Sequence, residues 1–200
     1  MKKFERLERN AREEEIQLAA IKLFNEKGFK AVTMQDIVDN VSLSKGGVYR
    51  IYPSTVEILN DLIIKGMRLR NEYYLDYLKE IDNFDMKSLV DMVIDSLFIY
   101  SDISSIYVEF LIEKSHNQKL EKLYQEIYLQ SFIETKDLFN QNSADISLDV
   151  QEMLKALADV MNVLIIAIKL LDLRETIIQD KALISELVMT LLKNKSQKEK

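Results

Sequence analysis

Residues 33–57 of the chain read TMQDIVDNVSLSKGGVYRIYPSTVE, and this stretch decides the fold. Thr33 followed three residues later by Asp36 is typical of a helix start, because each side chain can cap a backbone N–H group of the other. Ser44 is a good N-cap for a second short helix, and Pro53 ends that helix. The stretch therefore predicts two short helices joined by a tight turn.

The segments on either side of this stretch are also helical by pattern. Ser54 and Glu57 form a further S-x-x-E box, which opens a long helix that we expect to run to about residue 81. On the other side, residues 12–27 carry apolar side chains at helical spacing and end at Gly28. Three such helices predict a helix-turn-helix, whose third helix enters the major groove of DNA.

The remainder of the chain predicts a separate helical body. Apolar residues spaced by three and four predict helices over 86–98, 103–111, 118–139, 148–171 and 180–193. The helix 148–171 is apolar on almost every side after Ala156, so we expect it to be buried all round. The fold class is therefore all-α, with one domain at 1–62, a second at 63–200 and a boundary near residues 60–65 of the fourth helix.

Composition excludes several classes of protein. The chain has 200 residues, 48% of them hydrophobic, with only 4 Gly and 1 Pro, which favours a packed helical protein over a disordered one. Without Cys there is no disulfide or thiolate nucleophile, and His116 alone makes a metal site improbable, so we expect a surface His at a helix end. We see no nucleophile or phosphate loop, and predict neither an enzyme nor a cofactor. The charged start and the absence of a spanning run predict a cytoplasmic protein.

The net charge of −6 is distributed unevenly. Residues 1–59 carry 10 Lys and Arg against 9 Asp and Glu, whereas residues 60–200 carry 17 against 24. The first nine residues form a basic arm with Lys2, Lys3, Arg6 and Arg9. We therefore expect any contact with phosphate groups in the N-terminal third.

The run AAIKLFNEKGFKAVTMQDIVDNVSLSKGGVYRIYPSTVEIL, residues 19–59, resembles the DNA-binding domain of the TetR (tetracycline repressor) family. The shared features are an Ala-rich first helix ending L-F, then E-x-G-F, a K-G-x-V-Y step and Y-P-S. The resemblance covers about residues 12–62. It implies that 1–62 binds DNA and that 63–200 forms a helical ligand-binding and dimerisation domain.

The resemblance assigns roles to individual residues of this chain. Lys45, Gly46, Gly47 and Tyr49 would face bases and adjacent phosphates, and the two glycines would let the backbone approach DNA closely. The full predicted DNA-binding set is Thr33, Gln35, Ser44, Lys45, Gly46, Gly47, Tyr49, Arg50 and Thr55. Tyr52 is more simply a core aromatic.

Two positions depart from the family pattern. Thr55 stands where the family usually has a Lys that pairs with phosphate, so the charge-based anchor is in doubt, and Lys45, Arg50 and the basic arm would compensate. Ser42 stands at a step that is often Gly, which implies a different turn geometry.

The second domain carries weaker signals. Its aromatic residues are interpreted either as core or as the lining of a ligand pocket, with Tyr100, Tyr107, Phe110, Tyr124 and Tyr128 as the pocket set. Asp91 and Asp95 are spaced by four and are expected on a solvated face. Asp159 and Asn162 would either orient a ligand or fix the pairing of two subunits, and we favour the interface. The residues predicted for that interface are Val160, Leu164, Ile168, Leu187 and Leu191.

The function predicted from these features is a homodimeric repressor that a small molecule releases from its operator. The alternative is a DNA-binding protein of the same fold that is controlled by a protein partner, or that activates transcription. The predicted partners are operator DNA, a second copy of the chain and an unidentified small-molecule effector, with no membrane.

Overall fold

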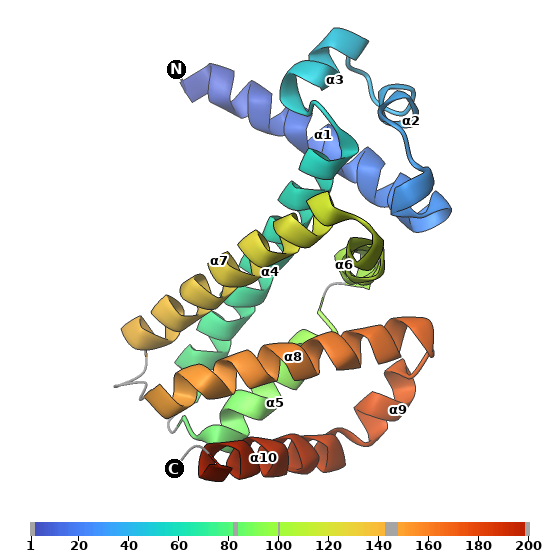
Figure 1. Ribbon diagram of the computed structural model, residues 1–200. Coiled ribbons are helices and arrows are strands. Elements are labelled where there is room, and N and C mark those ends of the chain that lie inside the picture. Colours follow the sequence, from blue (N-terminus) through green and yellow to red (C-terminus); the bar gives the residue numbers. More distant parts are fainter. Residues whose placement is uncertain (1–2, 82–83, 100, 143–147, 199–200) are drawn as a thin grey trace. The chain divides into compact units, whose positions relative to one another are not determined.

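The computed structural model describes residues 3–81, 84–99, 101–142 and 148–198, and within these ranges every regular element is a helix (Figure 1). The elements, in chain order, are α1 (Lys3–Lys27), the 3₁₀ turn η1 (Phe29–Ala31), α2 (Met34–Val38), α3 (Lys45–Ile51), α4 (Thr55–Glu80), α5 (Met86–Ser96), α6 (Ser101–Glu113), the 3₁₀ turn η2 (Lys114–His116), α7 (Gln118–Asn142), α8 (Leu148–Leu170), α9 (Arg174–Gln179) and α10 (Lys181–Lys198). The prediction of an all-α fold is confirmed.

The chain packs as two units. The first comprises Met1–Gly66 and Asp102–Tyr124, and the second comprises Met67–Ser101 and Gln125–Lys200. The division within the fourth helix lies close to the predicted boundary, but the packing of residues 102–124 with the first unit was not predicted. Whether 1–62 and 63–200 act as functional domains stays a prediction.

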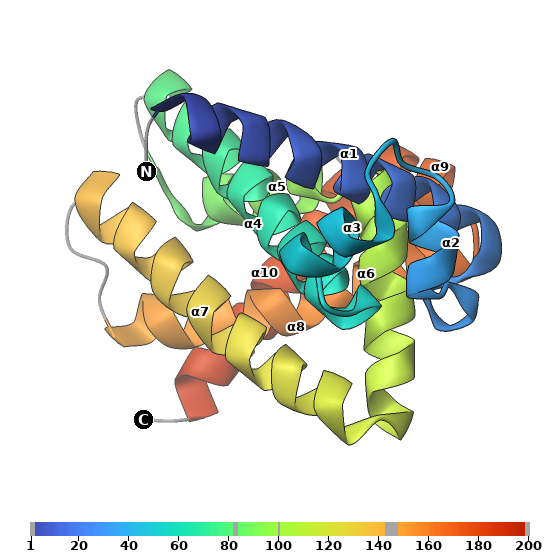
Figure 2. The same ribbon diagram turned by 90° about the horizontal axis from the view of Figure 1, so that it is seen from above.

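The first unit is built on α1, with α2 and α3 beside it (Figures 1 and 2). The apolar stripe predicted for residues 12–27 is its core, since Ile16, Ala20 and Phe24 are fully buried. Gly28 ends α1 with φ of +81°, a left-handed conformation that glycine adopts without strain. The chain then turns so that the rings of Phe24 and Phe29 meet edge to face, with centroids 5.3 Å apart.

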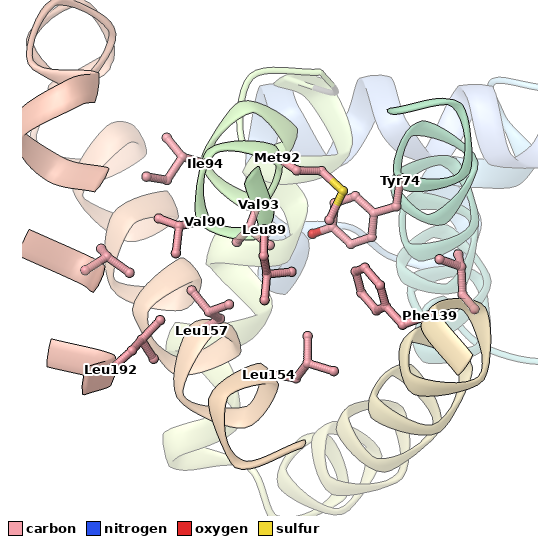
Figure 3. Packing of buried hydrophobic residues seen from close by; sticks show 12 residues of the cluster. Tyr74, Leu89, Val90, Met92, Val93, Ile94, Phe139, Leu154, Leu157 and Leu192 are labelled. Carbon is pink, nitrogen blue, oxygen red and sulfur yellow. The ribbon is translucent and has the colours of Figure 1, made fainter. Parts of the chain in front are cut away.

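The core of the second unit lies between α5, α8 and α10, with α4 and α7 contributing aromatic rings (Figure 3). The predicted stripe of α5 is buried, and Val90, Met92 and Ile94 are almost completely inaccessible to solvent. Tyr74 of α4 and Phe139 of α7 point toward one another across this core. Each such buried apolar side chain stabilises the unit by about 1.5–3 kcal/mol relative to an exposed one.

The expectation of a solvated face at Asp91 and Asp95 is wrong. The Asp91 carboxylate accepts a hydrogen bond of 2.7 Å from the hydroxyl of the buried Ser185, and it also pairs with Lys87. Asp95 pairs with Lys181 at 2.6 Å. These carboxylates therefore hold α10 against α5, a role that spacing on one helix does not reveal.

The expectation that the helix 148–171 is buried all round is also wrong for a single chain. Leu154 and Leu157 are buried, but Val163 is 67% exposed and Leu170 and Leu171 are exposed too. The side of α8 that is not covered by its own unit therefore presents apolar side chains to solvent.

Candidate nucleic-acid interface

The start of α2 is fixed by the capping box that the sequence predicts. The Thr33 hydroxyl accepts a hydrogen bond from the Asp36 backbone N–H at 3.2 Å, and the Asp36 carboxylate accepts one from the Thr33 N–H at 2.9 Å. The Lys27 ammonium also donates to Asp36 at 2.7 Å. The hydrogen bond from Lys27 contributes most, followed by those from Thr33, and together they hold the pKa of Asp36 well below its usual range.

The start of α3 likewise follows the prediction, because the Ser44 hydroxyl caps the Gly47 N–H at 3.2 Å. Gly46 faces open space, and a Cβ built on it would meet no atom within 4 Å. A Cβ on Gly47 would lie 3.3 Å from the Ser44 oxygen, a tight fit. A glycine within a helix costs about 1 kcal/mol relative to alanine. Packing inside the chain does not explain why residue 46 is glycine, because the side chain of alanine would fit there.

The outer face of α3 gathers the polar residues predicted to meet DNA. Lys45 donates a hydrogen bond of 3.3 Å to Gln35 of α2, and its ammonium lies 5.9 Å from the centroid of the Tyr49 ring. Tyr49 is 40% exposed, and Arg50 is exposed as well. In the part of the chain that the structure describes, neither Lys45 nor Arg50 forms an ion pair, so both positive charges face solvent. The structure thus brings Gln35, Lys45 and Tyr49 together at one surface.

The turn between α2 and α3 is anchored on α1 through Ser42. Its hydroxyl donates to the Glu15 carboxylate at 3.0 Å, and its backbone N–H donates to the other oxygen of that carboxylate. These bonds lower the pKa of Glu15, the backbone bond most. A serine in place of the usual glycine therefore gives the turn a side-chain attachment to the helix beneath it.

Tyr52 joins the end of α3 to the helices on both sides. Its ring is buried, as predicted, while its hydroxyl donates to Asp61 of α4 and accepts from Gln17 of α1, both at 2.9 Å. Burial chiefly raises the pKa of Tyr52, so the phenol stays protonated. This pair of hydrogen bonds fixes α3 relative to α1 and α4 within the first unit.

The remaining predicted residues lie at the helix termini. Thr55 is the first residue of α4 and is partly exposed, and the neighbouring Ser54 hydroxyl donates a hydrogen bond to the Glu57 carboxylate, a contact between side chains and not the backbone bonds of a capping box. Of the basic arm, Lys2 lies outside the described residues. Arg9, further along α1, pairs with Glu13 at 2.7 Å.

Helix α6 contributes residues to the first unit that the sequence did not point to. The Glu109 carboxylate accepts a hydrogen bond of 2.6 Å from the Phe29 backbone N–H, and Glu113 pairs with Lys30 at 3.5 Å. Their partners lie 80 residues or more away in sequence, so no local pattern could have identified them. Helix α6 is thereby tied to the turn that connects α1 with α2.

The second unit contains a small cavity of about 60 Å³ that opens to solvent, between α4, α5, α7 and α8. Of the aromatic residues predicted to line a pocket, Tyr128 lines this cavity. Tyr107, Phe110 and Tyr124 instead form a chain of rings in the first unit, with centroids 6.2 Å apart at each step. Tyr100 lies outside the described residues. The lining residues that the sequence missed include Arg70, Tyr74, Ser131 and Thr135.

The helices predicted to pair two subunits present an apolar stripe. Leu183, Leu187 and Leu191 lie at intervals of four on α10 and are 57%, 56% and 61% exposed. Of the predicted residues on α8, Val160, Leu164 and Ile168 are partly buried in the single chain, next to the exposed Val163.

Other chemistry has little support in the described ranges. His116 is exposed at the end of η2, and no group of three His, Cys, Asp or Glu side chains among the described residues is placed to hold a metal ion. None of the described helices is long and apolar enough to cross a membrane.

Comparison with known sequences connects this site to a family. Residues 16–62 match the family described as "Bacterial regulatory proteins, tetR family". The uncharacterized HTH-type transcriptional regulator YfiR of Bacillus subtilis is 30% identical over 133 residues, which cover 62% of this chain and 63% of the relative. The negative transcriptional regulator IcaR of the biofilm operon icaADBC in Staphylococcus epidermidis is 28% identical over 98 residues, 48% of this chain and 49% of the relative. The matches thus span 63% and 49% of the two relatives' lengths.

Solved structures with a similar fold cover more of the chain. GusR of Salmonella enterica superposes with a TM-score of 0.66 at 17% identity, over 92% of this chain and 96% of that one. A putative transcriptional regulator from Saccharomonospora viridis, solved in complex with choline, has a TM-score of 0.55 at 18% identity, over 78% and 84% of the two chains.

Proposed function

We propose that the protein, whose residues 16–62 match the tetR family of bacterial regulatory proteins, is a homodimeric repressor that a small molecule releases from its operator in the cytoplasm. The observation that carries the DNA-binding part is the outer face of α3. There Lys45 and Arg50 have no carboxylate partner among the described residues, and Gly46 leaves the backbone open. At the start of a short helix in the major groove, cationic side chains can contact the flanking phosphates, and a backbone without side chains can approach the DNA closely.

The apolar stripe on α10 supports the homodimer. Stripes of large exposed apolar side chains are uncommon on monomeric proteins, and a second copy would cover this one by twofold symmetry. Two subunits would then present two α3 helices to a near-palindromic site. The similarity to a negative regulator, IcaR, supports repression.

The cavity of the second unit supports control by a small molecule. It lies between helices and is mostly apolar with a few polar groups, as ligand sites usually are. The choline complex of the neighbour from S. viridis indicates that this fold accommodates such a ligand. An effector that binds the DNA-free form better than the DNA-bound form would shift the population away from the operator.

Selection of binding sites from random duplex DNA tests the proposal. The purified chain should enrich a near-palindromic sequence whose half-sites are separated by about one helical turn, roughly 34–36 Å, or a multiple of it. No enrichment, or enrichment of a single unrepeated half-site, would contradict the proposal.

A matched pair of variants then tests the placement of α3. Lys45→Gln should weaken operator binding, whereas Lys119→Gln, which removes the same charge from an exposed position on α7, should leave it unchanged. Equal losses in a gel-shift titration would show that only the net charge matters.

A further inference from the structure

Among the described residues that line the cavity of the second unit, Arg70 is the only charged side chain. It reaches the cavity from α4. The wall around it is apolar and aromatic, with Phe132 and Phe139 from α7 and Leu154 and Met161 from α8. Tyr74, Phe139 and Leu154 extend from three different helices in this region (Figure 3).

The partners of Arg70 among the described residues are all neutral. Its Nη2 atom donates to the Ser131 hydroxyl at 2.9 Å and to the Thr135 hydroxyl at 3.3 Å, and it also lies 3.4 Å from the Asn71 amide oxygen. Its guanidinium carbon lies 5.6 Å from the centroid of the Tyr74 ring. The Nε atom is buried and has no hydrogen-bond partner, and no carboxylate of the described residues forms an ion pair with Arg70.

Within the described ranges, this arrangement leaves the positive charge of Arg70 without a compensating carboxylate. Arginine stays protonated in proteins, so burial cannot neutralise it as it can a carboxylate or a lysine. A cation in an apolar wall is costly unless it is paired. Its planar set of N–H donors fits a carboxylate in two parallel hydrogen bonds. Ser131 and Thr135 hold the guanidinium in place but supply no negative charge.

We propose that the cavity binds an amphipathic carboxylate, with the carboxylate on Arg70 and an apolar body against Phe132, Phe139 and Leu154. The inference rests on the proposed function, because it names the class of effector that the second unit senses. A cationic ligand such as choline is disfavoured at this site, since it would face the guanidinium.

Calorimetric titration of the full-length protein, without DNA, tests the ligand class. The probes are hexanoate, octanoate, decanoate and phenylacetate, each compared with its primary amide. At least one carboxylate should bind about ten- to hundredfold tighter than its amide, as expected when a charge-assisted hydrogen bond replaces a neutral one. If every carboxylate and its amide bind equally, or if no carboxylate binds at millimolar concentration, the inference is overturned.

Arg70→Gln and Arg68→Gln form the matched pair of variants. Both remove one positive charge from α4, but Arg68 is exposed and does not line the cavity. Arg70→Gln should abolish the preference for the carboxylate, and Arg68→Gln should retain it. Retention of the preference in both variants would overturn the inference.

Thermal unfolding of the ligand-free variants separates a binding role from a structural one. If Arg70 serves a ligand, its replacement by the apolar Met removes an uncompensated charge, and the melting temperature should stay equal or rise. A marked fall would show instead that Arg70 is a structural link between α4 and α7, which contradicts the inference.

Operator release, measured separately, distinguishes this inference from the proposed function. A carboxylate that binds through Arg70 without releasing DNA would contradict the gated repressor and leave the ligand class standing. Release by a neutral molecule, undiminished in Arg70→Gln, would leave the repressor standing and overturn the carboxylate class.

Discussion

At the scale of single residues, Gly46 and Gly66 are both helical glycines in very different surroundings. A Cβ on Gly46 would meet open space, whereas a Cβ on Gly66 of α4 would lie 2.9 Å from Cγ2 of Ile103 on α6. Glycine is a poorer helix former than alanine, so each of the two positions calls for a reason. Packing within the first unit explains Gly66 but not Gly46, which is consistent with the proposed approach of DNA to α3.

Gly46→Ala should therefore stabilise the free protein and weaken its binding to DNA. The helix gains up to about 1 kcal/mol of unfolding free energy, because alanine is the better helix former. The added methyl group would separate α3 from the DNA backbone. Chemical unfolding and gel-shift titration measure the two effects, and unchanged operator affinity would show that the backbone at residue 46 does not approach DNA.

Gly66→Ala is the contrasting variant. Overpacking typically costs about 1–3 kcal/mol, which outweighs the gain in helix propensity. We expect a lower melting temperature, partly restored by Ile103→Ala in the same chain. A rise in melting temperature would mean that Ile103 of α6 can move away from residue 66 at little cost.

Thr55 tests the alignment of the turn before α4. Thr55→Lys should tighten binding to operator and random DNA alike, because a phosphate contact positions the protein without reading bases. The slope of log affinity against log salt should steepen by about 0.9. The free protein should lose a few tenths of a kcal/mol, roughly, since a cation is unfavourable at a helix N-terminus. An unchanged salt slope would indicate that residue 55 does not face the DNA backbone.

At the scale of elements, the sequence predicts helices well where a side chain caps them. Ser44 and the Thr33–Asp36 box start α3 and α2 where expected. Helix α9 was missed, and its N-cap is Leu173, which makes no side-chain capping bond. Helix α1 begins nine residues earlier than predicted, in a segment without an apolar stripe where charged pairs such as Arg9–Glu13 lie one turn apart.

The capping box of α2 makes the stability of the first unit dependent on pH. The pKa of Asp36 is lower in the folded chain than in the unfolded chain, so its carboxylate stabilises the fold above the unfolded pKa, roughly pH 4. That stabilisation is lost as the pH falls toward the folded value. Asp36→Asn should be less stable than the wild type at neutral pH, and the difference should shrink below roughly pH 4. Chemical unfolding at several pH values measures the difference in unfolding free energy between the two proteins. A difference that does not vary with pH would show that the Asp36 carboxylate does not stabilise the fold through its charge.

At the scale of the whole molecule, the sequence identified the candidate DNA-contacting residues better than the lining of the cavity. Lys45, Tyr49 and Gln35 are brought together by two short, locally capped helices. By contrast, Arg70 and Ser131 meet from α4 and α7, which are far apart in sequence. Contacts between such distant segments depend on tertiary packing and not on local sequence. For the same reason the sequence could not show that Tyr107 and Phe110 pack in the first unit.

The stripe on α10 leads to a prediction about assembly. Leu187→Glu places a charge where a second copy would pack, so it should produce a monomer that binds a half-site weakly. Leu18→Glu is the matched control, because Leu18 is equally exposed but lies on α1. Sedimentation at micromolar concentration should show a monomer for the first variant and a dimer for the second. A dimer in both would assign the interface to other helices.

The hydrogen bond from Phe29 to Glu109 limits how this protein can be recombined with others. The unit that contains α3 is assembled from two separate stretches of chain, Met1–Gly66 and Asp102–Tyr124. If residues 1–66 alone were fused to the second domain of another protein, the Phe29 N–H would lose its Glu109 acceptor, and Gly66 would lose its packing against Ile103. We expect such a chimera to keep the structure of the first unit only if residues 102–124, which include most of α6, are transferred as well. If the first unit binds DNA as proposed, the part of the chain that must be transferred is therefore larger than residues 16–62, which match the family.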